Sequence, residues 1–242
     1  MFTTKRQALF ISIILLLFTF NIRAQVNQIR IVTEHLPPFQ IGKDNRLVGG
    51  SVGNEINKLL RIVLPDHSIE VMPWARAYKV ALNRPNTIIF SIVRTPERED
   101  KFIWIGKVAD VSTELITLKR NALEPVKSIN ELRHIQIGVK RQDAVADFLA
   151  SEGFLFGEQL VEIVNTFSTM KMLEKERITA IPSNRLITEY YCQTTGCNTT
   201  DFKTIYVFKQ LSEEFYLAAS KGTDPMLIKR LKEAFLMLDL PL

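Results

Sequence analysis

The sequence predicts an α/β protein of two lobes, each with a mixed, mostly parallel sheet flanked by helices. Segments with the apolar pattern of strands alternate with segments of helical pattern, and this alternation runs twice along the chain. Thr87–Val93 is almost continuously apolar, as expected of a parallel strand covered on both faces. No Ser/Gly-rich linker separates the two sets, so we expect lobes that hinge on short β-rich connections.

The first set alternates strand-like and helix-like segments. In chain order these are residues 29–33, 51–64, 67–72, 75–82 and 87–93. Thr95 and Pro96 then predict a further helical turn, because a hydroxyl residue suits the cap and proline suits the first helical position.

The second set repeats this rhythm. Ser128 with Glu131 three residues later forms a capping box that predicts a short helix, and Asp143 predicts the cap of a longer one. Strand-like and helix-like segments follow at residues 135–139, 160–164, 170–176, 178–181 and 186–191. Outside this set, further strands are expected at residues 112–119, 202–208 and 215–219, and a last helix from Asp224 and Pro225.

The first 24 residues have the pattern of a secretory leader. Lys5 and Arg6 precede an apolar run over residues 8–20, and a short polar stretch leads to Ala24. The run is shorter than the roughly 20 apolar residues that a spanning helix needs. We therefore expect a signal peptide cleaved after Ala24 and a periplasmic mature protein.

The net charge argues against nucleic acid as a partner. The chain of 242 residues carries a net charge of +5, and three of these charges belong to Lys5, Arg6 and Arg23 in the leader. A mature protein with about two net charges has no strong electrostatic attraction to nucleic acid or to a membrane surface.

Cysteine use fits export. Cys192 and Cys197 are the only cysteines, and in an oxidising compartment they are expected to close a short loop around Gly196 by a disulfide. Two thiols are half of a zinc site, so we expect no metal. The histidines are scattered, at His35, His67 and His134.

A series of short motifs occurs in an informative order. They are Thr33-Glu-His-Leu-Pro-Pro-Phe39, Leu47-Val-Gly-Gly50, Trp74 before an amphipathic helix, Ser91-Ile-Val-Arg-Thr-Pro-Glu-Arg98, Ile137-Gly-Val-Lys140, Arg177-Ile-Thr-Ala-Ile-Pro-Ser-Asn184 and Phe215-Tyr-Leu-Ala-Ala-Ser-Lys-Gly222. Together they resemble family 3 solute-binding proteins, the periplasmic receptors of polar amino acid ABC transporters. The resemblance implies a two-lobed, periplasmic-binding-protein-like (type II) fold. We expect residues 25–118 and 212–242 to form the first lobe and residues 119–211 the second.

The resemblance also implies roles for single side chains. Arg98 stands where the family's arginine pairs with a ligand carboxylate, and the alternative is a solvated arginine in a charged run. Phe39 and Trp74 stand where aromatic rings enclose the ligand, and the alternative for both is core packing. Ser91 ends a buried strand, where open α/β sheets bind ligands. Glu34, beside the first strand end, is a candidate partner for a cationic group.

Several positions depart from the family's amino acid receptors. Asn184 stands where those receptors usually have an aspartate for the ligand's ammonium group. Gln142-Asp143 replaces a Gly-Thr or Gly-Ser helix entry, and Asp143 is expected to cap the N–H groups that a carboxylate would otherwise use. Ser51 replaces another aspartate. These changes leave open both a carboxylate ligand and a cationic solute, the latter met by Glu34 and Asp143.

We therefore expect an exported binding protein that captures a small polar solute, an amino acid or a related carboxylate or amine, between its lobes. The expected partner is an inner-membrane ABC permease, with a membrane sensor as the alternative, and the expected state is a monomer without cofactors. An enzyme of the small-carboxylate dehydratase type would need a positioned acid or base. Glu34 and Asp143 are the conceivable ones, and no nucleophile motif accompanies them, so we expect no catalysis.

Overall fold

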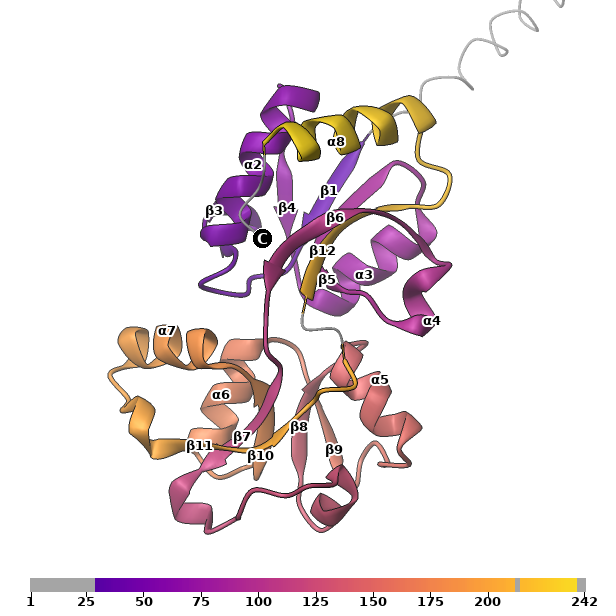
Figure 1. Cartoon of the computed structure of the whole chain (residues 1–242). Coiled ribbons are helices and arrows are strands. Elements are labelled where there is room, and N and C mark those ends of the chain that lie inside the picture. The colour runs from indigo at the N-terminus through magenta and orange to yellow at the C-terminus, as the bar shows by residue number, and fades with distance from the viewer. Residues whose placement is uncertain (1–28, 212–213, 239–242) are drawn as a thin grey trace, which may run out of the picture.

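The computed structural model describes residues 29–211 and 214–238, so the expected leader at residues 1–24 lies outside it. The chain forms two lobes, each built on one mixed sheet flanked by helices (Figure 1). The predicted α/β architecture is confirmed. Both sheets are mixed, but they are not mostly parallel: among the described residues, four pairings between strands are parallel and six are antiparallel.

The first lobe contains a seven-stranded sheet of order β2-β3-β4-β1-β5-β12-β6. Its strands are β1 (Arg30–Thr33), β2 (Ile41–Lys43), β3 (Arg46–Gly49), β4 (Ile69–Val71), β5 (Thr87–Val93), β6 (Phe102–Asp110) and β12 (Glu214–Ser220). Its helices are α2 (Ser51–Val63), α3 (Trp74–Asn83), α4 (Pro96–Glu99) and α8 (Pro225–Met237).

Both faces of this sheet are covered, which explains the continuous apolar run of β5. One face packs against α2 and α8, where Ile56, Leu60 and Leu231 are fully buried. The other face packs against α3 through Ala77 and Ala81. A strand between two such layers has no solvent-facing side, so its residues do not alternate between apolar and polar.

The second lobe contains a five-stranded sheet of order β11-β7-β10-β8-β9. Its strands are β7 (Glu114–Leu118), β8 (Ile137–Lys140), β9 (Leu160–Ile163), β10 (Ala180–Ser183) and β11 (Phe202–Val207). Its helices are α5 (Ala144–Ser151), α6 (Thr166–Glu174) and α7 (Arg185–Thr195), with short 3₁₀ turns η1 (Lys119–Asn121), η2 (Ile129–Leu132) and η3 (Thr199–Asp201).

The chain passes from the first lobe to the second between β6 and β7, and it returns between β11 and β12. We expected the first lobe to run to residue 118, but β7 pairs with β10 and β11 in the second sheet. Leu115 and Leu118 are buried in the cores of the second lobe. The crossing therefore lies before Glu114, because the apolar residues of β7 are buried by the helices of the second lobe.

Most predicted helix starts are confirmed. Asp143 caps α5 by accepting a hydrogen bond from the Val145 N–H, and the capping box of Ser128 and Glu131 is present, although the turn after it is 3₁₀. Thr95 occupies the N-cap position of α4, but its side chain makes no capping hydrogen bond.

The β2–β3 hairpin was not predicted. Its strands are short, and the two residues of its turn, Asp44 and Asn45, both have positive φ angles, of 50° and 60°. Asp and Asn tolerate this left-handed backbone better than most residues, and two such residues in succession suit a tight hairpin.

Candidate ligand-binding cleft

A cavity of about 80 Å³ lies between the lobes, lined by residues of both. We call it the interlobe cavity. Its walls include residues at or just beyond the carboxyl ends of β1, β8 and β10. The carboxyl ends of strands are where open α/β sheets hold their ligands.

Six of the seven side chains that the sequence singled out for ligand contact line this cavity. They are Glu34, Trp74, Ser91, Arg98, Asp143 and Asn184. The seventh, Phe39, is not among the lining residues: it lies in the first-lobe core, with its ring edge-on to that of Phe215 at 5.4 Å. Phe215 itself lines the cavity, so Phe39 supports a lining residue from behind.

Arg98 is buried, with only 2% of its side chain exposed, and its guanidinium group is held by both lobes. In the first lobe, Nη1 donates to the Val93 carbonyl at 3.2 Å. In the second, Nη2 donates to the Gln142 carbonyl at 3.0 Å and reaches the Asp147 carboxylate at 3.4 Å. The guanidinium also lies 4.9 Å from the centre of the Tyr78 ring. These contacts compensate for the burial of its charge.

Trp74 shares one of these partners. Its Nε1 donates to the Gln142 carbonyl at 2.8 Å, so this oxygen accepts hydrogen bonds from two first-lobe side chains, Trp74 and Arg98. Gln142 has a φ of 59°, a left-handed conformation that is costly for a residue with a side chain. The sequence marked Gln142 as unusual, but it gave no sign that its carbonyl would join the lobes.

Glu34 and Lys140 form an ion pair between the lobes. Lys140 Nζ lies 2.6 Å from Glu34 Oε1 and 3.3 Å from Asp143 Oδ2. The side chains of Glu34 and Lys140 are only 5% and 14% exposed. Burial raises the pKa of Glu34, although Lys140 opposes the shift. Burial disfavours the Lys140 ammonium, but the two carboxylates outweigh it and the pKa of Lys140 is raised.

Ser91 reaches the cavity through an irregularity in β5. Opposite it, the register of β12 shifts, so that Tyr216 pairs with Ile92 and Leu217 with Phe90. Ser91 is the extra residue of this β-bulge and has a φ of 59°. Its hydroxyl donates to Gln40 Oε1, a fully buried side chain, at 2.9 Å.

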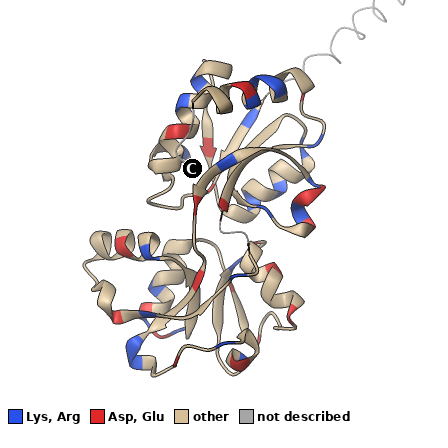
Figure 2. Cartoon of the chain, viewed as in Figure 1, with Lys and Arg blue, Asp and Glu red and all other residues tan. Residues whose placement is uncertain are grey.

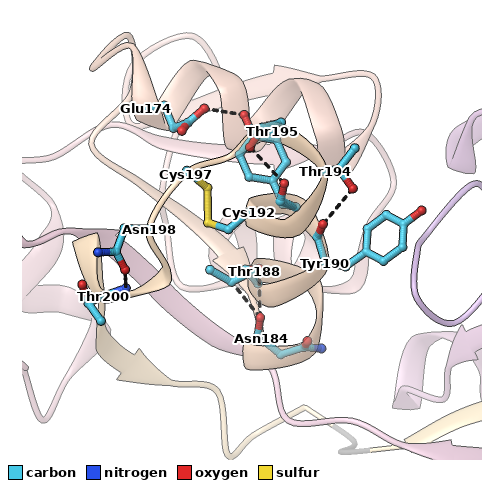
Figure 3. The surroundings of a disulfide bond; sticks show 12 residues. Glu174, Asn184, Thr188, Tyr190, Cys192, Thr194, Thr195, Cys197, Asn198 and Thr200 are labelled. Atoms are coloured by element: carbon cyan, nitrogen blue, oxygen red, sulfur yellow. Dashed lines mark hydrogen bonds between the residues drawn. A yellow bond between two sulfur atoms is a disulfide. The ribbon is translucent and has the colours of Figure 1, made fainter.

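Asn184 lies at the start of α7, where its Oδ1 accepts a hydrogen bond from the Ile187 N–H. The same helix ends at the expected disulfide, which joins Cys192 to Cys197 around the left-handed Gly196 (Figure 3). One end of α7 therefore faces the cavity, and the other is tied to the segment that leads into η3.

Residues 29–211 and 214–238 contain no cluster of three or more His, Cys, Asp or Glu side chains suited to a metal ion. None of the helices in these ranges has the length and apolarity needed to cross a membrane.

Known proteins match this chain in structure but not in sequence. No protein-family model matches it, and no curated protein matches it in sequence. Among solved structures, a histidine kinase sensor domain similar to periplasmic binding proteins superimposes with a TM-score of 0.70 at 15% identity, covering 88% of this chain and 91% of the other.

Two further structures superimpose with a TM-score of 0.69 each. The arginine-, lysine-, histidine-binding protein ArtJ from Geobacillus stearothermophilus gives a TM-score of 0.69 at 15% identity, over 88% of this chain and 90% of ArtJ. The GluR0 ligand-binding core from Nostoc punctiforme, solved with L-glutamate, gives 0.69 at 13% identity, over 88% and 93%. These likenesses establish a periplasmic-binding-protein-like fold.

Proposed function

We propose that this chain is an exported solute-binding protein that captures a small polar solute between its lobes for uptake by an ABC transporter. The observation that carries the proposal is the interlobe cavity, where charged side chains from both lobes are buried together. Structural neighbours named as amino acid binders, among them ArtJ, support the class of solute. The expected leader supports a periplasmic location, with an inner-membrane permease as the partner and the monomer as the working state.

Arg98 is the proposed contact for a carboxylate of the solute. It belongs to the first lobe, whereas its partners Gln142 and Asp147 belong to the second. Opening of the lobes removes both partners and leaves Arg98 oriented by the Val93 carbonyl. A carboxylate can then pair with the guanidinium group, and closure of the second lobe buries the complex.

We infer binding without catalysis. Each of the two carboxylates that the sequence offered as an acid or base, Glu34 and Asp143, contacts Lys140 in the interlobe cavity. A general base needs a free carboxylate within reach of the substrate proton.

A sensing receptor is the second candidate, favoured by the likeness to a histidine kinase sensor domain. In Figure 2, basic and acidic residues are interspersed along the ribbons of both lobes. A permease gene and an ATPase gene beside this one would favour transport, and a kinase gene would favour sensing.

The test of solute binding is a thermal-shift screen of residues 25–242 against amino acids, amines and small carboxylates, followed by calorimetry. A solute at 100 times its Kd should add about 2.7 kcal/mol of stability. For a carboxylate solute, Arg98→Ala should abolish the shift. Arg94→Ala is the control, because Arg94 is nearby in the chain but pairs with Glu99 outside the cavity. Failure of every solute to stabilise the protein contradicts the proposal.

A further inference from the structure

The ammonium group of Lys140 is surrounded by the kinds of side chain that would bind the cationic group of a ligand. Glu34 lies at 2.6 Å, Asp143 at 3.3 Å, and the centre of the Trp74 ring at 6.0 Å. Two carboxylates and an aromatic ring are the partners by which proteins bind ammonium groups. All four residues line the interlobe cavity.

We propose that Lys140 is a specificity determinant: it neutralises Glu34 from within the chain and excludes solutes with a cationic group from the cleft. This inference rests on the proposed function, because it concerns the solute of the same cavity. It narrows the polar solutes of the proposed function to those that carry a carboxylate, or no charge, and lack an ammonium or guanidinium group, so the cleft would not take amino acids of the kind that ArtJ is named for.

The exclusion follows from competition within a buried site. A cationic solute group can reach Glu34 only by displacing Lys140. The Lys140 ammonium group would then lose its ion pair with Glu34, although the Lys140 side chain is only 14% exposed. An unpaired buried charge is strongly unfavourable. Lys140 is also part of the chain, so its effective concentration at Glu34 exceeds that of a dissolved solute.

Arg98 does not prevent binding of an anionic group in the same way. Its second-lobe partners are a backbone carbonyl and a carboxylate, and the Asp147 contact is long, at 3.4 Å. The Asp147 side chain is 57% exposed, so it regains water when the pair separates. The cavity therefore contains a cation, Arg98, that can pair with an anionic group of a solute. The anion Glu34, in contrast, is already paired with Lys140 of the same chain.

The test is the substitution Lys140→Met, which keeps much of the apolar side chain and removes the charge. In calorimetry, L-arginine, L-lysine and n-butylamine should bind Lys140→Met at least about tenfold more tightly than the natural sequence, since each can place a charge-assisted hydrogen bond on Glu34. The double variant Glu34→Gln with Lys140→Met should lose this gain.

Lys107→Met is the matched control. Lys107 also pairs with an aspartate three residues on, Asp110, and with a distant glutamate, Glu214, but it does not line the interlobe cavity. It should gain no affinity for the same probes. Circular dichroism checks that each variant is folded, and Lys140→Gln, whose amide can donate to Glu34, replaces Lys140→Met if the latter does not fold.

The inference is overturned if the natural sequence binds the cationic probes as tightly as the variant, or if the folded variant gains nothing. Its failure is distinguishable from failure of the proposed function. If a small carboxylate without an ammonium group binds the natural sequence while Lys140→Met gains no affinity for cations, or if an amino acid binds the natural sequence, the inference alone fails. If no probe binds either protein, both fail.

Discussion

Single residues in this protein obtain their properties from partners distant in the sequence. Glu34 is a buried carboxylate because Lys140, from the other lobe, supplies a counter-charge. Ser91 lines the cavity at a bulge in its strand, and its hydroxyl donates to the buried Gln40. His35, beside Glu34, accepts a hydrogen bond at Nδ1 from the Gly42 N–H of β2 at 3.0 Å. Only the imidazole with an unprotonated Nδ1 can accept it.

We predict that His35 makes the protein less stable in mild acid. Burial lowers the pKa of His35 below its ordinary value of 6.5. Because the folded state binds the proton less tightly than the unfolded state, this contribution is complete above pH 6.5 and is lost as the pH falls through the lowered pKa. Urea unfolding at several pH values between 5 and 7.5 measures the loss.

His35→Asn supplies the control for this prediction. An asparagine oxygen can accept from Gly42 and does not titrate, so the variant should lose less stability than the natural sequence over the same pH range. Equal losses in the two proteins would assign the pH dependence to other groups.

At the scale of elements, the two ends of the α7 helix have different surroundings. The N-cap residue of α7, Asn184, lines the interlobe cavity, and the helix ends beside the disulfide between Cys192 and Cys197. Tyr191, next to the disulfide, hydrogen-bonds Glu174 at the end of α6. The carboxyl end of α7 is therefore fixed by one covalent bond and one polar contact, while Asn184 and Ile187 at its other end line the interlobe cavity.

We predict that the disulfide stabilises the folded chain by about 2 kcal/mol, the value that loop-closure entropy gives for so short a loop. The variant with Cys192→Ser and Cys197→Ser should lose this amount in guanidinium unfolding. Dithiothreitol should reproduce the loss in the natural sequence and leave the serine variant unchanged. A serine variant of unchanged stability would contradict the prediction.

The order of strands and helices could be predicted from sequence because each central strand is buried on both faces and each helix has one apolar side. The β2–β3 hairpin could not, since its short strands alternate weakly. The sheet to which β7 belongs was also misjudged, because an apolar strand pattern does not say which neighbours it pairs with. The Glu34–Lys140 pair is beyond sequence reasoning, as the two residues are 106 positions apart and on different lobes.

At the scale of the whole molecule, closure depends on few polar contacts. Across the two lobes, Glu34 pairs with Lys140. The Gln142 carbonyl of the second lobe accepts hydrogen bonds from Trp74 and Arg98 of the first. Trp74 is almost fully buried at this junction, so its indole reports whether the lobes are closed. The other tryptophan, Trp104, can be replaced by phenylalanine to leave a single reporter.

We predict that Glu34→Ala opens the lobes. Breaking a buried ion pair costs about 3–5 kcal/mol, and here that cost weakens the contact between lobes. In the Trp104→Phe background, Trp74 emission should shift to the red and the radius of gyration from X-ray scattering should increase. Glu70→Ala should do neither, since Glu70 pairs with Arg30, also at 2.6 Å, within the first lobe. Unchanged emission in Glu34→Ala would contradict the prediction.

The pairing of β6 with β12 has a consequence for how such a protein can be built. Glu214 lies opposite Asp110, at the point where the chain leaves the first lobe and comes back to it. In topology the whole second lobe is thus the loop of a β-hairpin that belongs to the first. The entropy of closing a loop grows only slowly with its length, so the first lobe tolerates a long insertion there. A short turn from Asp110 to Glu214 would give a minimal single-lobe protein, and another α/β unit grafted at the same two residues would give a two-lobed protein with a new second lobe.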